Sequence, residues 1–200
     1  MENIYILYIN LKNREDRNKE IIQELNKYNL EGERVDAVFN DSGVIGCTLS
    51  HIKCIDIAID KNYDEICILE DDFIFVNDLN KVSIPKKYDV FLLGGTIQKQ
   101  EIYDKTHMRI LSSQRTEGYI IKKDYYKTLK EIFKESVKKN MTELLPSHNL
   151  DMLWKRLQKN DLFLCDIWGV VGGQREGYSD ILNRNIKRHN FKKFKNNKSF

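Results

Sequence analysis

Three consecutive carboxylates give the strongest chemical signal in the sequence. Glu70, Asp71 and Asp72 directly follow the apolar run at residues 65–69. Adjacent acids at the end of a buried strand repel one another and lose hydration, so a divalent cation or a cationic partner is needed to offset the repulsion. Carboxylates suit Mg²⁺ or Mn²⁺, and ligands of open α/β sheets bind beyond the carboxyl ends of strands. The triplet predicts a metal and phosphate site; the alternative is a charged turn.

A second polar group stands between the first apolar run and the first helical pattern. It contains Asn10, Arg14 and Arg17. A helix N-terminus offers free N–H groups, and arginines there can grip a diphosphate. The alternative is that both arginines pair with acids of the same helix and face solvent.

Three further segments carry candidate binding groups. Ser50 and His51 open a helical pattern after Gly46, where they could bind a sugar or phosphate, although a histidine here could equally pack the helix. Asp151 reads as a first-turn acid that complements a helix dipole. The polar loop at 173–180, which includes Gln174 and Asp180, could close over a ligand or form a simple turn.

The elements that position these groups alternate along the chain. Apolar runs predict strands at 4–11, 33–38, 65–69, 73–76, 88–93, 118–121 and 162–171. Helical spacing predicts helices at 13–29, 48–61, 123–138 and 150–158. This order predicts a single α/β domain over residues 1–182, with a mostly parallel central sheet flanked by helices.

Composition excludes several function classes. Lys and Arg number 33 against 30 acids in 200 residues, so there is no general basic field for nucleic acid. The exception is a basic tail at 183–200, either a solvated terminus or a contact for phosphates. Phosphate-loop, dinucleotide-binding and serine-nucleophile motifs do not occur. No apolar run approaches the roughly 18 residues of a transmembrane helix.

Cysteine usage indicates a reducing compartment. The four cysteines form no C-x-x-C pair, which argues against structural zinc. Cys47, Cys67 and Cys165 have apolar neighbours and read as buried reduced thiols. The first residues lack a secretory pattern, so a cytoplasmic location is expected.

Together these segments resemble glycosyltransferase family 25, the lipooligosaccharide and procollagen galactosyltransferase-like enzymes. The resemblance follows the family's order over nearly the whole chain. Its segments are Ile9-Asn10-Leu11 with Arg14 and Arg17, Gly46-Cys47-Thr48-Leu49-Ser50-His51, Ile68-Leu69-Glu70-Asp71-Asp72, residues 88–95 ending in Gly94-Gly95, residues 116–121, residues 150–153 and residues 178–181. The chain is closer in size to a bacterial or viral relative than to the collagen branch.

The resemblance implies a GT-A fold and an inverting transfer of galactose or glucose from a UDP-sugar, with Mn²⁺ or Mg²⁺, to a glycan or protein hydroxyl. Asp151 is the candidate general base. The metal candidates are Glu70, Asp72, Gln174, Asp180 and His189. The nucleotide-sugar candidates are Asn10, Arg14, Arg17, Ser50, His51, Glu70, Asp71, Gly94 and Gly95.

Two other functions compete with transfer. A glycosyltransferase scaffold that only binds a glycan or protein would not need the intact acid triplet and Asp151. Sugar nucleotidyl transfer would be expected to show a glycine-rich basic loop after the first strand, and none is present. The acceptor stays open, because acceptor pockets are built from loops.

Overall fold

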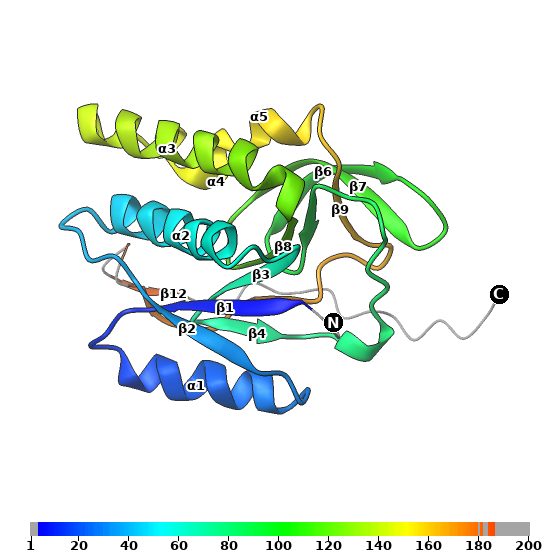
Figure 1. Ribbon diagram of the computed structural model, residues 1–200, viewed down its shortest axis with the longest axis horizontal. Coiled ribbons are helices and arrows are strands. Elements are labelled where there is room, and N and C mark those ends of the chain that lie inside the picture. The colour runs from blue at the N-terminus through cyan, green and yellow to red at the C-terminus, as the bar shows by residue number, and fades with distance from the viewer. Residues whose placement is uncertain (1–3, 180, 182–183, 187–200) are drawn as a thin grey trace.

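The computed structural model describes residues 4–179, 181 and 184–186. Eight strands form the main sheet, and neighbouring strands are hydrogen-bonded (Figure 1). Their order across the sheet is β2 (Gly32–Asp36), β1 (Tyr5–Asn10), β3 (Glu65–Glu70), β8 (Gly118–Lys122), β5 (Val90–Leu92), β9 (Phe163–Asp166), β7 (His107–Gln114) and β6 (Thr96–Ile102). Only β8 and β7 run opposite to the other six. The predicted α/β class with a mostly parallel sheet is confirmed.

Helices cover both faces of the sheet. Helix α1 (Glu15–Asn26) lies on one face, and α2 (Gly43–Asp60) and α3 (Tyr126–Thr142) lie on the other (Figure 1). The short helices α4 (Leu150–Leu153) and α5 (Lys155–Gln158) join the second layer, so the helix predicted at 150–158 is broken in two. Single 3₁₀ turns occur at Leu79–Lys81, Lys123–Tyr125 and Pro146–His148.

Strand β1 shows why the first apolar run has no polar face. Leu7 and Ile9 enter the core beneath α2 and α3, whereas Ile6 and Tyr8 enter the core beside α1. Successive side chains of a strand point to opposite faces, and here both faces are covered. A continuous apolar run is the expected result.

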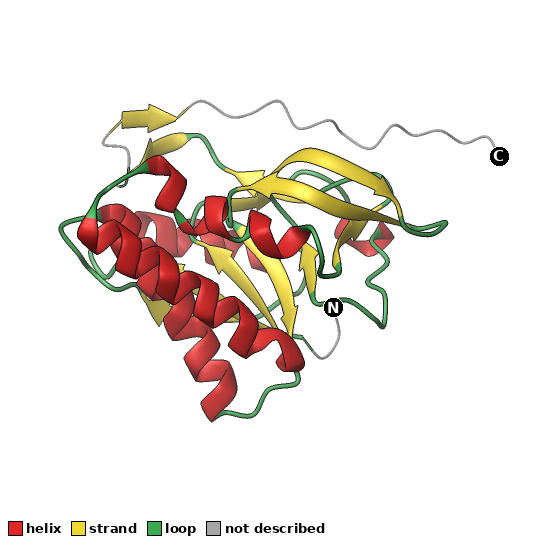
Figure 2. Cartoon of the chain, turned by 90° about the horizontal axis from the view of Figure 1, so that it is seen from above, coloured by secondary structure: helices red, strands yellow, loops and turns green. Residues whose placement is uncertain are grey.

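The hairpin of β6 and β7 was not predicted. Almost every residue of β6 is exposed, so the sequence offers neither an apolar run nor alternation there. Figure 2 shows the helices gathered over one part of the sheet, with this hairpin extending beyond them. Among the described residues, no helix is long and apolar enough to cross a bilayer.

Two small sheets complete the fold. The segment predicted as a strand at 73–76 forms β4 (Phe73–Phe75), which pairs with β10 (Gly172–Gln174) rather than joining the main sheet. Strand β11 (Gly177–Ser179) pairs with β12 (Arg184–Ile186). The strand predicted at 162–171 ends with β9 at residue 166, and residues 172–174 pair elsewhere.

Phe73 anchors the turn that follows the acid triplet. Its ring is fully buried, and three glycines leave the space that it fills. A Cβ added at Gly172 would lie 2.2 Å from Phe73 Cζ, and one at Gly118 would lie 2.5 Å from Cε2. At Gly94 the corresponding distance to Cε2 is 3.2 Å. The ring therefore fixes where β4, β8 and β10 meet, directly after Asp72.

We predict that Phe73→Ala lowers the free energy of unfolding by about 3–5 kcal/mol, because it removes a large ring and leaves a cavity. Phe39→Ala is the matched control: Phe39 is 81% exposed, so a change within about 0.5 kcal/mol is expected. Urea denaturation of both variants measures the difference. Equal losses would contradict the anchoring role of Phe73.

Candidate functional site

The candidate site lies where β1 and β3 end. The parallel register places Ile9 beside Glu70, so Asn10 and the acid triplet leave the sheet at the same edge. A cavity of about 370 Å³ opens there between the loop after β2, the first half of α2 and the segment from β10 to residue 181. This volume falls in the range of small-molecule pockets.

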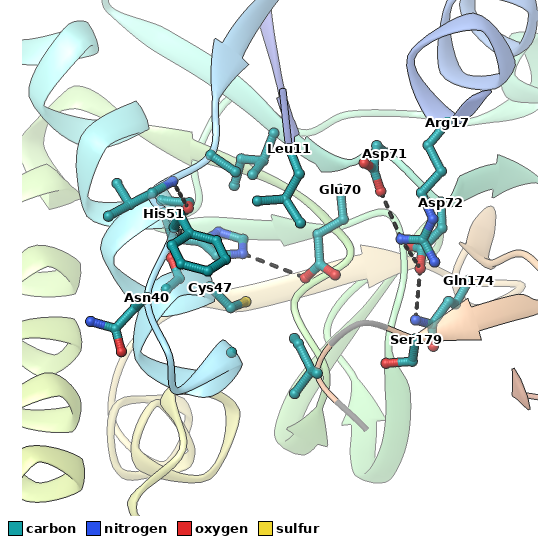
Figure 3. A pocket seen from close by; sticks show the side chains of 18 of the residues that line it. Leu11, Arg17, Asn40, Cys47, His51, Glu70, Asp71, Asp72, Gln174 and Ser179 are labelled. Atoms are coloured by element: carbon teal, nitrogen blue, oxygen red, sulfur yellow. Dashed lines mark hydrogen bonds and ion pairs between the residues drawn. The ribbon is translucent and has the colours of Figure 1, made fainter. Parts of the chain in front are cut away.

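The side chains of the three acids point in two different directions. Figure 3 shows Glu70 turned toward His51 and Cys47, while Asp71 and Asp72 are turned toward Arg17. The triplet therefore serves two parts of the cavity wall.

Arg17 holds the two aspartates together. Its Nη1 lies 2.9 Å from Asp71 Oδ1 and 3.4 Å from Asp72 Oδ2, and its Nη2 donates to the carbonyl of Tyr178. Asn10 Nδ2 donates to Asp71 Oδ2 at 2.7 Å. Burial raises the pKa of Asp71, and the charge of Arg17 opposes that rise. One guanidinium thus bridges α1, the acid triplet and β11.

Asp72 keeps one oxygen without a partner. Gln174 Nε2 donates to Asp72 Oδ2 at 2.8 Å, while the buried Oδ1 makes no hydrogen bond within the described residues. Burial, followed by the charge of Glu70, raises the pKa of Asp72 to about 7. An orphaned carboxylate oxygen at a cavity wall fits a missing cation or ligand donor.

Glu70 faces α2 instead. Its Oε1 accepts from Thr116 Oγ1 at 3.2 Å and lies 3.4 Å from His51 Nε2. Burial acts to raise the pKa of Glu70, but His51 and Thr116 lower it below its usual value. Nδ1 of His51 lies 3.1 Å from Tyr119 Oη in the core, which fixes the ring.

Ser50 and Cys47 line the same wall of α2. The Ser50 hydroxyl accepts from Val38 N at 2.8 Å, which joins α2 to the loop before it, and donates to Gly46 O within the same helix at 2.7 Å. Cys47 is a half-buried free thiol. Burial, and then the charges of Glu70, Asp151 and Asp72, raise the Cys47 pKa well above its usual value.

Asp151 does not line the cavity, but Arg115 links it to Gln174 at the cavity wall. Asp151 Oδ2 accepts from the backbone N–H of Arg115 at 3.0 Å, and Arg115 Nη1 lies 3.4 Å from Gln174 Oε1. Arg115 has a φ of +71°, a left-handed conformation that turns its backbone N–H toward the helix. Burial raises the pKa of Asp151, while the Arg115 contact opposes the rise.

Other predicted site residues lie apart from the cavity wall. Arg14 forms a two-pronged pair with exposed Asp16 at 3.0 and 2.9 Å. Gly94 and Gly95 do not line the cavity, and Gly95 N donates to Glu117 Oε1 at 3.0 Å. Asp180 and His189 lie outside the described residues.

Two residues of the site were missed from the sequence. Glu117 is buried immediately before β8, and its Oε2 has no partner among the described residues. Burial, and then the charge of Glu70, raise its pKa to about 8. An acid opening an otherwise apolar strand was the available signal. Phe39 projects at the cavity mouth, and its sequence surroundings gave no signal.

The comparisons with known proteins agree with the resemblance seen in the sequence. The model of glycosyltransferase family 25, described as LPS biosynthesis protein, matches residues 41–138, which include the Gly46–His51 segment and the acid triplet. The predicted resemblance to this family is confirmed. A search of curated proteins found no match.

Several solved structures are distantly similar. A197 from STIV is 11% identical, with coverage of 94% of this chain and 95% of its own and a TM-score of 0.48. A glycosyltransferase involved in glycosylation of the PBCV-1 major capsid is also 11% identical, with coverages of 84% and 93% and a TM-score of 0.46. A Drosophila β-1,4-galactosyltransferase 7 mutant, in complex with manganese, UDP-Gal and xylobiose, is 11% identical. The match covers 64% of this chain and 52% of that chain, with a TM-score of 0.38.

The buried Glu117 carboxyl predicts a pH effect on stability. The native state holds this proton more tightly than the unfolded chain, so stability decreases as pH rises from the unfolded value near 4.5 to the native value of about 8. Glu117→Gln should remove part of this decrease and raise stability at pH 9 by up to about 4 kcal/mol. Thermal denaturation between pH 5 and pH 9 measures it. Exposed Glu31→Gln is the control; parallel curves for wild type and Glu117→Gln would contradict the prediction.

Proposed function

We propose that this chain, whose residues 41–138 match the model of glycosyltransferase family 25, transfers galactose or glucose from a UDP-sugar to a hydroxyl of a glycan or protein. The observation that carries the proposal is the acid triplet at the end of β3, which opens onto a cavity of about 370 Å³ beside Arg17 and Gln174. The proposed architecture is of the GT-A type, with inversion at the anomeric carbon.

A divalent cation fits the aspartate side of the cavity. Asp72 Oδ1 is buried and has no hydrogen-bond partner among the described residues, while Gln174 Nε2 donates to the other oxygen of Asp72. A carboxylate oxygen of this kind suits Mn²⁺ or Mg²⁺, which also take phosphate oxygens. Asp72 is the proposed ligand, with Glu70 closer to the ribose or a bound water. When present, the cation would neutralise charge on the diphosphate leaving group.

The polar groups around the cavity suit the remaining parts of a UDP-sugar. Arg17 brings a positive charge to the wall where the diphosphate would lie, close to Asn10. Phe39 offers an exposed ring at the mouth, where a base or sugar could stack. Ser50 and His51 form the opposite wall, although the Ser50 hydroxyl already joins α2 to its preceding loop.

Asp151 is the proposed general base. An inverting transfer requires a carboxylate that takes the proton from the acceptor hydroxyl as that oxygen attacks the anomeric carbon. The Arg115 backbone N–H donates to Oδ2 of Asp151, which fixes the orientation of the carboxylate. Burial raises its pKa, which brings a carboxylate closer to the basicity that proton transfer at neutral pH favours.

We predict that Asp72→Ala abolishes Mn²⁺-dependent release of UDP from UDP-galactose and UDP-glucose, a loss of ~100-fold or more. Calorimetry should also show loss of the metal-dependent part of UDP-sugar binding. Exposed Asp60→Ala, at the far end of α2, is the control. If wild type bound no nucleotide sugar in the presence of metal, a binding module on a glycosyltransferase scaffold would replace this proposal.

Asp151→Asn should retain UDP-sugar binding and reduce turnover by about 10²–10⁴-fold, because the amide accepts the Arg115 hydrogen bond but takes no proton. Calorimetry and UDP release separate the two effects, with Asp60→Asn as the matched control. Unchanged turnover in Asp151→Asn would rule out this residue as the base.

A further inference from the structure

We propose that Cys47, His51 and Glu70 form a second cation site, which binds a thiolate-preferring divalent ion such as Zn²⁺ or Cd²⁺. The thiol sulfur, an imidazole nitrogen and a carboxylate oxygen of these residues all lie within 4.8 Å of one another. An ion shared by the three would lie about 2.0–2.3 Å from the nitrogen, oxygen and sulfur atoms that bind it.

His51 supplies an independent sign of a missing ligand. The ring is fully buried, and its Nε2 lies 3.4 Å from Glu70 Oε1, within ion-pair distance but without a hydrogen bond to any described residue. Its other nitrogen, Nδ1, lies 3.1 Å from Tyr119 Oη. Histidines that bind metals usually donate the second ring N–H to a partner of this kind, which orients the ring and leaves the lone pair for the ion.

The backbone arrangement makes the trio rigid. Cys47 and His51 are four residues apart on α2, so their side chains lie on the same face of the helix. Glu70 arrives from the end of β3, whose strand pairing fixes its position. All three residues line the cavity, so a fourth position toward the cavity stays available for water or a ligand. Three protein ligands and an open position form the usual arrangement of an accessible zinc site.

The chemistry of this trio differs from that of the aspartate side. Asp72 offers only oxygen to an ion, whereas Cys47 and His51 offer sulfur and nitrogen. Soft donors select Zn²⁺ and Cd²⁺ over Mg²⁺. Glu70 belongs to both groups, so an ion at the soft site would withdraw Glu70 from the proposed donor site and inhibit transfer. This inhibition, unlike the binding, rests on the proposed function.

Binding is tested on the full chain, freed of metal by chelation. Titration with Cd²⁺ should give one equivalent with a thiolate-to-metal charge-transfer absorption, and Zn²⁺ competition against a chromophoric chelator should give its affinity. Cys47→Ala should abolish the absorption and weaken Zn²⁺ binding by ~10-fold or more. His51→Gln should weaken it comparably. Cys54→Ala, which removes a fully buried thiol from the same helix, and Asp72→Ala should both leave binding unchanged.

Absence of the Cd²⁺ absorption in folded wild type, or Zn²⁺ affinity unaltered by Cys47→Ala, would overturn the proposal. Circular dichroism of each variant verifies that the fold is retained, and Cys47→Ser provides a second variant if Cys47→Ala does not fold. In the UDP-release assay, Zn²⁺ added to the Mn²⁺ enzyme should inhibit wild type and Cys54→Ala but not Cys47→Ala. Absence of UDP release from every protein would count against the proposed transfer, while the binding titrations decide the soft site.

Discussion

Arg17 neutralises part of a carboxylate cluster that would otherwise be hard to bury. Asp71 and Asp72 are both nearly inaccessible to solvent, and Arg17 is the cation that contacts both. Removing one partner of a buried ion pair leaves an uncompensated charge, so the position of α1 and the conformation after β3 depend on each other. The contact of Arg17 with the Tyr178 carbonyl extends this dependence to β11. The cavity wall is therefore assembled from three distant parts of the chain by one guanidinium.

Burial of carboxyl groups at this wall lowers the stability of the native state and also leaves carboxyl oxygens that could bind a ligand. The carboxyls of Asp72 and Glu117 both have raised pKa values, to about 7 and about 8, because they are shielded from water and lie near Glu70. Both also keep an oxygen without a hydrogen bond within the described part of the chain. A cation at the proposed donor site would relieve the repulsion between Asp72 and Glu70.

Sequence patterns predicted those parts of the fold whose burial leaves a local trace. Strands β1 and β3 are covered on both faces, so they read as apolar runs, and the acids at the end of β3 were placed correctly at the sheet edge. The β6–β7 hairpin left no such trace because β6 is exposed. Glu117 was missed because its place in the site depends on the antiparallel pairing of β8 with β3. This pairing, which the sequence pattern did not indicate, brings the start of β8 next to the end of β3. The roles assigned to individual site residues stay predictions.

The exposed hairpin has a consequence for how this sheet ends. Strand β6 is an edge strand, and edge strands with free N–H and C=O groups can template pairing with another chain. Its pairing with β7 shifts register on both sides of Lys99, and its exposed residues are polar or charged except for Ile102. Irregular pairing and charge both make an edge a poor template for intermolecular β-structure. At the opposite edge, β2 carries Glu33, Arg34 and Asp36. Both borders of the sheet are thus protected against self-association through strand addition.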